Sequence, residues 1–313
     1  MKAKIIKAKK GTVTTIQLRT TDTSIPNAIR TTLQTEIPVY AIDTDNIEYG
    51  ECDILFPIER ITHVIGLIPV KQTLSPDVTF SLHAEFDKNK VLTNDTSFEP
   101  RNIIISNDIQ SSNGLNYFHP NMSIIELRKY VGKIHIDKMT LIRKPQLYHA
   151  RHQACKTFYK IVDDKKGQVT TELILKPVSS KYPEYSMDTY TAFKESIQIL
   201  IDKCKTVRSN IENDVYITSE SIITGKDKTE LKLVKYKIDD ESRQFGYLLQ
   251  CQIFNTPSYD GDKYLVGFHH IHPLTRAFIL AFQWDNSYHK GTPKKFLIKT
   301  LTALIKTLVD LRA

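Results

Sequence analysis

The sequence predicts an α+β fold in which one arrangement, a strand, a short helix, a second strand and a long helix, occurs twice. Long amphipathic helices are expected at residues 188–209 and 293–312, because apolar residues recur there every three or four positions. Residues 46–164 are instead β-like and rich in turn signals. The first copy is therefore expected to carry a β-rich insert, and the second copy to be uninterrupted. The repetition lies in the order of elements and not in sequence identity.

Composition is that of an ordinary globular protein long enough for two or three domains: 313 residues, 41% of them hydrophobic and 25% charged. The net charge of +8 is compatible with nucleic-acid or acidic protein partners, but its dispersal favours a solvated surface over direct DNA binding. The four cysteines form no C-x-x-C pair, which argues against a zinc ribbon or redox motif and favours a reducing, intracellular compartment. No apolar run approaches the ~18 residues of a membrane span.

The first copy opens with a strand at residues 12–18, where Thr, Val and Ile are frequent. A short helix is expected at residues 25–36. Pro26 suits its first turn, and Pro38 disfavours helix at the residue before it. The face of this helix expected to point into the core holds Ile29 and Leu33.

The remaining elements follow from the same kinds of signal. The first copy closes with a strand at residues 170–175 and the long helix at 188–209, which Asp188 can cap. The second copy repeats the order, with a strand at residues 230–238, a short helix at 241–254, strands at 264–268 and 278–283, and the final helix at 293–312.

The short helix and its exit carry a family resemblance. Residues 27–43 read N-A-I-R-T-T-L-Q-T-E-I-P-V-Y-A-I-D. This run resembles the signature of alpha-type RNA polymerase subunits: the N-terminal domain of the bacterial alpha subunit, its archaeal D-type counterpart and the third-largest subunit of eukaryotic polymerases. Residues 56–69 are similar to the F-x-x-H-R-[IL]-G-L-I-P run that opens the inserted domain of that family. Thr31 and Val64 stand where the family commonly has arginine.

The second copy resembles the small partner of these proteins, which is the L-type polypeptide of archaeal polymerases or the eleventh subunit of eukaryotic polymerase II. Residues 239–249 are similar to its E-D-H-T-L-G-N-x-[IL] start, and residues 265–274, L-V-G-F-H-H-I-H-P-L, to its F-A-G-Y-x-x-x-H-P-L run. Cellular polymerases carry the two partners as separate chains. The resemblance therefore implies a fusion of both in one chain, similar to the alpha-like subunits of large DNA viruses that transcribe outside the nucleus.

The resemblance implies two alpha-subunit-type dimerisation repeats, each a sheet with packed helices, that form an intramolecular pseudo-dimer. The first would comprise residues 1–44 and 168–212, the inserted β-rich domain residues 45–167, and the second residues 213–313. The apolar stripes of the long helices would be buried against the short helices. The residues expected in this interface are Ile29, Leu33, Phe193, Ile197, Leu200, Phe245, Leu248, Leu249, Leu301, Leu304, Ile305 and Leu308.

The implied function is that of a non-catalytic assembly platform in a multisubunit DNA-directed RNA polymerase. Its partners would be the largest and second-largest polymerase subunits together with smaller ones. DNA would be reached only through the complex, and neither a membrane nor a homodimer is expected. The first repeat would face the second-largest subunit and the second repeat the largest. The residues expected to contact a large subunit are Asn27, Arg30, Glu36 and His63. The compartment would be the host cytoplasm and the virion for a viral protein, and otherwise the nucleus.

Two other classes of function fit the sequence less well. His269, His270 and His272 suggest a metal site, since alternate strand residues share a face, but no acidic or cysteine partner lies at a suitable spacing. The cysteine cluster that often holds zinc or an iron–sulfur centre in cellular relatives is missing, so no metal or cofactor is expected. No cluster of carboxylates suits two-metal nucleotidyl transfer, so no catalytic residue is expected. The alternative is a stand-alone basic protein that binds nucleic acid with steep salt dependence.

Overall fold

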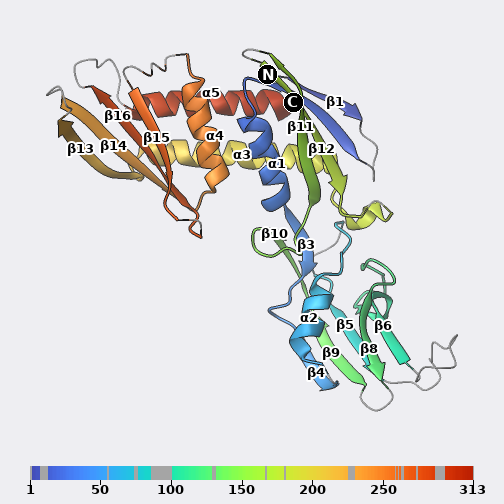
Figure 1. Ribbon diagram of the computed structural model, residues 1–313. Coiled ribbons are helices and arrows are strands. Elements are labelled where there is room, and N and C mark those ends of the chain that lie inside the picture. Colours follow the sequence, from blue (N-terminus) through green and yellow to red (C-terminus); the bar gives the residue numbers. More distant parts are fainter. Residues whose placement is uncertain are drawn as a thin grey trace.

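The computed structural model has the α+β character that the sequence predicts, with strands in several sheets and five α-helices in the part of the chain that it describes. Figure 1 shows an upper body, which holds the first and last parts of the described chain, and a lower body, which holds most of the residues expected to form the insert. The described residues are 2–7, 13–54, 56–73, 77–85, 101–128, 132–165, 168–179, 181–224, 230–257, 259, 261, 264–272, 274–285 and 293–312.

The first sheet is antiparallel and belongs to the first half of the upper body. Its strands, in spatial order, are β1 (Lys2–Lys7), β2 (Thr14–Thr20), β12 (Gln168–Pro177) and β11 (Cys155–Lys165). Alternate residues of β2 and β12 are buried, as expected for a sheet with one face covered. The covering helices are α1 (Ser24–Thr35) and α3 (Thr189–Glu212).

The expected end of the insert at residue 167 needs correction. β11, placed in the insert by the sequence, pairs with β12 from Cys155↔Pro177 to Lys165↔Gln168, with one irregularity between Ile161 and Asp163. The chain therefore re-enters the first sheet at Cys155. A continuous β-like pattern shows strand character, but it does not show which sheet a strand joins, because pairing is a long-range property.

The second sheet has the same topology as the first. Each is built in chain order from a hairpin, a helix, another hairpin and a long helix, and in each the fourth strand lies between the second and the third. The spatial order is β13 (Ile217–Thr224), β14 (Glu230–Asp239), β16 (Ala277–Asp285) and β15 (Tyr264–His270), and its helices are α4 (Arg243–Phe254) and α5 (Pro293–Arg312).

Helix ends agree with the local signals. Asp188 caps α3 by accepting a 2.9 Å hydrogen bond from the backbone N–H of Thr191. The cap of α4 is Ser242, whose hydroxyl accepts from the N–H of Phe245 at 3.2 Å. Among the described residues, no helix combines the length and the apolarity that crossing a bilayer requires.

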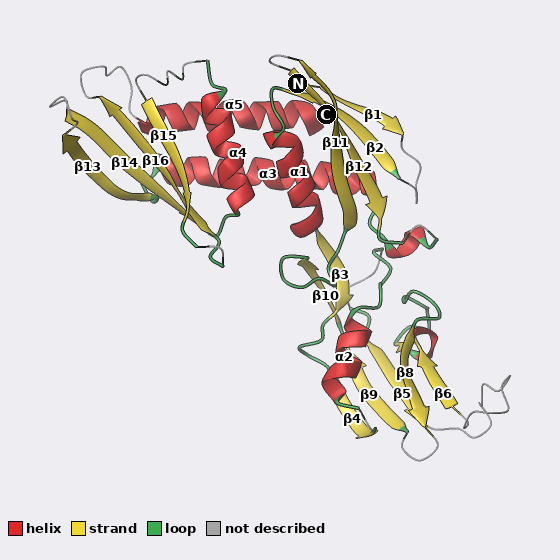
Figure 2. Cartoon of the chain, in the orientation of Figure 1, coloured by secondary structure: helices red, strands yellow, loops and turns green. Residues whose placement is uncertain are grey.

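The residues between β3 (Pro38–Ile42) and β10 (Leu141–Pro145), which the sequence predicts to be an insert, are joined to the upper body through the two-stranded ribbon that these strands form. This insert has a hydrophobic core of its own, and Figure 2 shows its strands accompanied by α2 (Ile58–Gly66). Its other elements are β4 (Glu48–Asp53), β5 (Phe80–Glu85), β6 (Arg101–Ile105), the 3₁₀ turn η1 (Ser106–Asp108), β7 (Gln110–Ser111), β8 (Ser123–Arg128) and β9 (Lys133–Met139).

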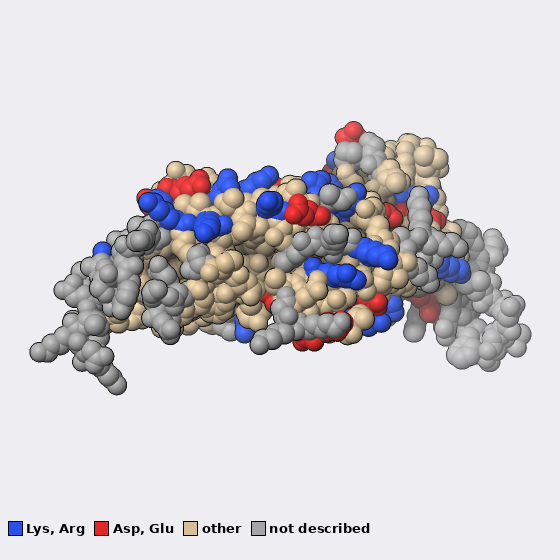
Figure 3. Space-filling model, turned by 90° about the horizontal axis from the view of Figure 1, so that it is seen from above, with Lys and Arg blue, Asp and Glu red and all other residues tan. Residues whose placement is uncertain are grey.

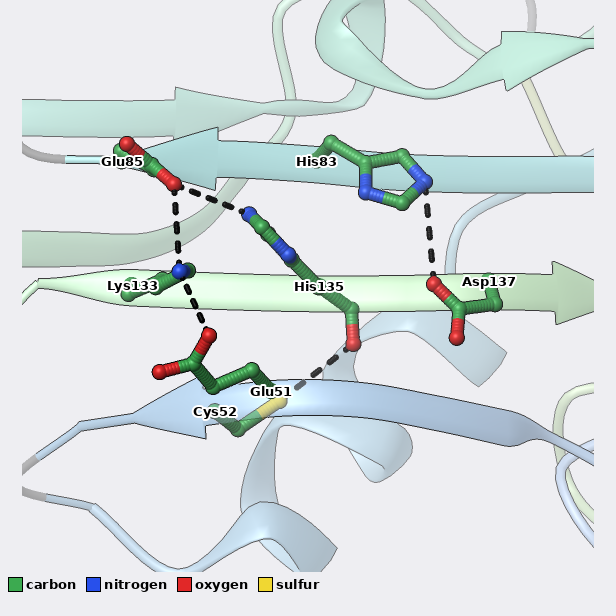
Figure 4. A network of polar contacts seen from close by, with 7 residues as sticks. All are labelled: Glu51, Cys52, His83, Glu85, Lys133, His135 and Asp137. Carbon is green, nitrogen blue, oxygen red and sulfur yellow. Dashed lines mark hydrogen bonds and ion pairs between the residues drawn. The ribbon is translucent and has the colours of Figure 1, made fainter.

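The solvent-facing side of the insert sheet is polar and internally paired. Ile134 and Ile136 of β9 point into the insert core, whereas His135 and Asp137 between and beyond them point outward. Lys133 lies 2.6 Å from a Glu51 carboxylate oxygen and 3.5 Å from one of Glu85. Figure 4 shows these groups joined to His135 and Cys52 across β4, β9 and β5, with the His83–Asp137 pair beside them. Exposed ion pairs of this kind contribute little stability, so this side is a solvated face.

Candidate assembly interface

A single hydrophobic core joins the two sheets of the upper body. It takes in buried residues from both sheets and from helices α1, α3, α4 and α5. The interface residues predicted from sequence all belong to it or, in the case of half-buried Ile305, pack against it. The buried members are Ile29, Leu33, Phe193, Ile197, Leu200, Phe245, Leu248, Leu249, Leu301, Leu304 and Leu308.

The helices pack in two pairs. The long helices α3 and α5 lie along one another, and the short helices α1 and α4 cross over them side by side (Figure 1). Where α1 begins, its residues meet the end of α4: the Gln252 amide donates to the Ser24 hydroxyl at 3.1 Å, and the Asn255 amide donates to Asp22. The contact between the short helices thus includes two hydrogen bonds at one end.

A largely buried ion triad lies beside this contact. The Lys203 ammonium on α3 is 2.7 Å from a Glu36 carboxylate oxygen at the end of α1 and 2.6 Å from one of Glu241, just before α4. The three side chains are only 13–14% exposed. Burial raises the pKa of Glu241, and Lys203 opposes that shift. The ammonium also lies 5.5 Å from the centre of the Phe245 ring. Lys203 therefore links elements of both halves.

Lys203 is not among the residues expected from the sequence at this interface, and Glu36 is among those expected to contact a large subunit. In the structure the Glu36 carboxylate is engaged by Lys203 within the chain, and its contact with a large subunit stays a prediction. The available signal was a lysine within the apolar stripe of α3, three residues after Leu200 and four before Val207. Such a position predicts burial, and a buried ammonium needs a partner.

Arg30 and Asn27 form a partly exposed polar surface on α1. The Arg30 guanidinium donates to the Asn27 side-chain oxygen at 3.0 and 3.2 Å and to that of Gln34 at 2.7 Å. Gln34 in turn donates to the backbone carbonyl of Thr157 on β11 at 2.9 Å. Thr31, which replaces the second arginine, hydrogen-bonds within the same group. The guanidinium is thus held along the helix with one side open to solvent.

His63 lies apart from this surface. It is exposed on α2, in the insert, with its ring centre 6.1 Å from that of His149. Burial is the main cause that lowers the pKa of His149. Figure 1 places α2 in the lower body and α1 in the upper one. The residues predicted to contact a large subunit therefore do not form one patch: Asn27 and Arg30 lie together, and Glu36 and His63 do not join them.

The histidines of the second half do not converge. β15 ends at His270, so His272 does not share a strand face with His270. His272 lies in a turn, where its ring nitrogen accepts from the backbone N–H of Leu274 at 3.2 Å. Across the described residues, no three His, Cys, Asp or Glu side chains are placed to hold a metal ion.

Neither the thiols nor the charged groups indicate another chemistry. Burial raises the pKa of both the Cys155 and the Cys204 thiols to about 12, so they are protonated at neutral pH and poor nucleophiles. On the face seen in Figure 3, basic and acidic side chains of the described residues are interspersed, without a continuous basic stripe.

Comparison with known proteins identifies the family. The model of the RNA polymerase Rpb3/Rpb11 dimerisation domain matches residues 15–204, more than half of the chain. DNA-directed RNA polymerase subunit Rpo3 of Thermococcus kodakarensis is 31% identical over 107 residues, 34% of this chain and 39% of that protein. Rpo3 of Pyrococcus horikoshii is 29% identical over 161 residues, 51% of this chain and 59% of that protein. The matches thus span less than two thirds of either relative. The chain belongs to the RNA polymerase Rpb3/Rpb11 dimerisation domain family.

Proposed function

We propose that the chain is a non-catalytic assembly subunit of a multisubunit DNA-directed RNA polymerase and that it contains both halves of the alpha-like heterodimer. The observation that carries the proposal is the single hydrophobic core built from two sheets of identical topology. A dimerisation domain needs a partner with a matching surface, and in this chain the second sheet with α4 and α5 supplies one.

The bounds of the proposed domains are inferred from the two sheets and their helices. The first dimerisation repeat consists of the first sheet with α1 and α3, and the insert is connected to it through the β3–β10 ribbon. The second repeat begins after α3. Fusion makes the association of the repeats intramolecular, so it no longer depends on the concentration of two chains. Fusion is also the arrangement of the viral alpha-like subunits that this chain resembles, and we therefore infer a viral polymerase that acts in the host cytoplasm.

The docking surfaces are assigned from the family resemblance together with the exposure of the residues. Arg30 and Asn27 present a charged, partly exposed surface on α1, which we assign to the second-largest subunit. An arginine held in place by its neighbours loses little side-chain entropy on binding, which favours its use as an anchor. The second repeat is assigned to the largest subunit.

The test is co-expression of the tagged chain with its two large subunits, followed by affinity purification and size-exclusion chromatography. The proposal expects one complex that contains all three chains in fixed ratio. Purification of the chain free of both large subunits would refute it. Steeply salt-dependent DNA binding by the isolated chain would instead support the stand-alone nucleic-acid-binding alternative.

A further inference from the structure

The insert and the upper body have separate hydrophobic cores, with the β3–β10 ribbon between them. Ile37 and Val39, where the ribbon begins, belong to a small third cluster, whereas Ile42 at the other end of β3 belongs to the core of the insert. A pair of strands without a third strand or a covering helix is only marginally stable. The ribbon by itself would therefore leave the angle of the insert poorly fixed.

A second connection is made by residues 181–187, which lead from the first sheet into α3. They include the 3₁₀ turn η2 (Pro183–Tyr185), which Figure 2 shows near the lower end of β12, on the side of the insert. The Ser186 hydroxyl accepts a hydrogen bond from the backbone N–H of Ser179 at 2.9 Å, and Met187 packs against the shared core. The segment is thus attached to the upper body at both ends.

On the insert side this segment contacts the ring of His119. The centre of that ring is 4.7 Å from the centre of the Tyr182 ring, in an edge-to-face arrangement, and 5.4 Å from that of Tyr185. Tyr185 is buried, and the Lys71 ammonium lies 5.8 Å from its ring centre. Edge-to-face aromatic pairs attract one another beyond the effect of the area they bury. The cluster therefore holds one ring of the insert against two rings of the upper body.

Gln72 of the insert adds hydrogen bonds to both connections. Its side-chain oxygen accepts from the backbone N–H of Tyr40 on β3 at 2.9 Å, and its amide donates to the Tyr40 carbonyl at 3.1 Å. The backbone N–H of Gln72 donates to the carbonyl of Glu184 in η2 at 3.4 Å. One residue thus contacts the ribbon on one side and η2 on the other.

Part of the seam between the two bodies is hollow. A cavity of about 460 Å³ lies there, and its lining includes Gln72 and Thr73 from the insert and Pro177, Met187 and Thr189 from the upper body. Domains joined by an interface that is neither large nor hydrophobic are expected to move relative to one another. The angle of the insert therefore depends on the aromatic cluster and the Gln72 hydrogen bonds.

We propose that residues 181–187 are a brace that holds the insert at one angle to the upper body, with His119, Tyr182 and Tyr185 as its latch. Loss of the latch frees the insert to swing on the β3–β10 ribbon while both cores stay folded. The brace keeps α2 at a constant distance from α1, so a partner that contacts both helices meets a preformed surface and loses less entropy on binding. This inference does not depend on the proposed function.

The experiment measures the distance between the two bodies of the full chain by double electron–electron resonance. Spin labels are attached at two exposed helix positions, Glu59→Cys on α2 and Thr206→Cys on α3. The two half-buried thiols are first removed by Cys52→Ser and Cys251→Ser. The two buried thiols stay in place, because burial raises their pKa to about 12 and leaves them unreactive.

Tyr182→Ala and His119→Ala each remove one side of the latch. Each should broaden the distance distribution by about twofold or more, because the freed insert adopts several angles. The urea midpoint given by the fluorescence of Trp284, which is buried in the shared core, should stay at the wild-type value. The matched control is Tyr190→Ala, which removes a half-buried tyrosine that packs against the shared core and should leave the distribution narrow.

The inference is overturned if the wild-type distribution is already as broad as those of the latch variants, or if neither variant broadens it. Equal broadening by Tyr190→Ala would overturn it as well, since the effect would then not belong to the latch. His119 lies in the insert, so His119→Ala decides the question even where Tyr182→Ala lowers the stability of the upper body.

Discussion

Replacing Lys203 by methionine tests how the two halves are held together. Methionine is similar in length to lysine but removes the cation that lies between two carboxylates, each 13–14% exposed. Breaking a buried ion pair by removing one partner costs about 3–5 kcal/mol, because the remaining charges lie in a medium that solvates them poorly. We expect a loss of unfolding free energy in this range at pH 7.

The cost of Lys203→Met should also depend on pH. The pKa of Glu241 is raised above its ordinary value of 4.5, so the folded state holds its proton more tightly than the unfolded state. The contribution of this shift to the free energy of unfolding is fully present below pH 4.5 and is lost as the pH rises through the pKa of Glu241 in the folded state. Lys203 opposes this shift, so in Lys203→Met the pKa of Glu241 should rise further. The difference in unfolding free energy between variant and wild type should therefore grow from pH 5 to pH 8.

Equilibrium urea unfolding can measure this effect in the correct body of the protein. The sequence contains one tryptophan, Trp284, which is buried in the shared core and separate from the insert. Its fluorescence should report the unfolding of the upper body. The matched control is Lys205→Met on the same helix. Lys205 is exposed and 3.8 Å from Asp202, and its loss should cost less than about 0.5 kcal/mol.

A triple variant, Lys203→Met with Glu36→Gln and Glu241→Gln, separates the lost pair from the lost charge. With no charge left to bury, most of the stability should return. The reasoning would be refuted if Lys203→Met cost no more than Lys205→Met, or if its cost did not depend on pH.

Three further substitutions test the packing and the docking surface. Gly246→Val should destabilise the upper body by about 1–3 kcal/mol in urea unfolding, since its Cβ would overlap Phe268; an unchanged midpoint would contradict the packing of α4. Leu301→Ala, at a fully buried position of α5, should cost about 2–5 kcal/mol by the same Trp284 fluorescence assay. Arg30→Glu should reduce co-purification of the second-largest subunit by about tenfold while the urea midpoint stays close to wild type; normal assembly would exclude its docking role.

The helices could be predicted from sequence because their signals are local. Pro26 and Pro38 bracket α1, Asp188 caps α3, and Pro293 opens α5, each within a few residues of the expected boundary. The interface residues could also be predicted, since an apolar stripe of period 3.6 shows which face of a helix is buried. The stripe does not show what covers that face, and this was supplied by the family resemblance.

The polar part of the interface could not be read in the same way. Glu36 and Lys203 are 167 positions apart in the sequence, and only the fold brings the end of α1 beside the middle of α3. Charged residues at helix ends are usually exposed, so the sequence favours Glu36 as a residue that faces a partner. Long-range pairing of charges has no periodic signature in the sequence, and this is why the triad was missed.

Two edge strands, β1 and β13, were not predicted from the sequence, and the similarity of the two halves depends on them. β1, with the sequence K-A-K-I-I-K, reads in sequence as a basic terminus, and β13 was not predicted. Without β1 and β13, each half has three strands and two helices, an arrangement common to many folds. With them both halves have four strands in the order first, second, fourth, third, with a helix after each hairpin. A shared order of this length is a stronger argument for two equivalent repeats than the sequence patterns alone, and it supports the proposal that one chain performs the work of two subunits.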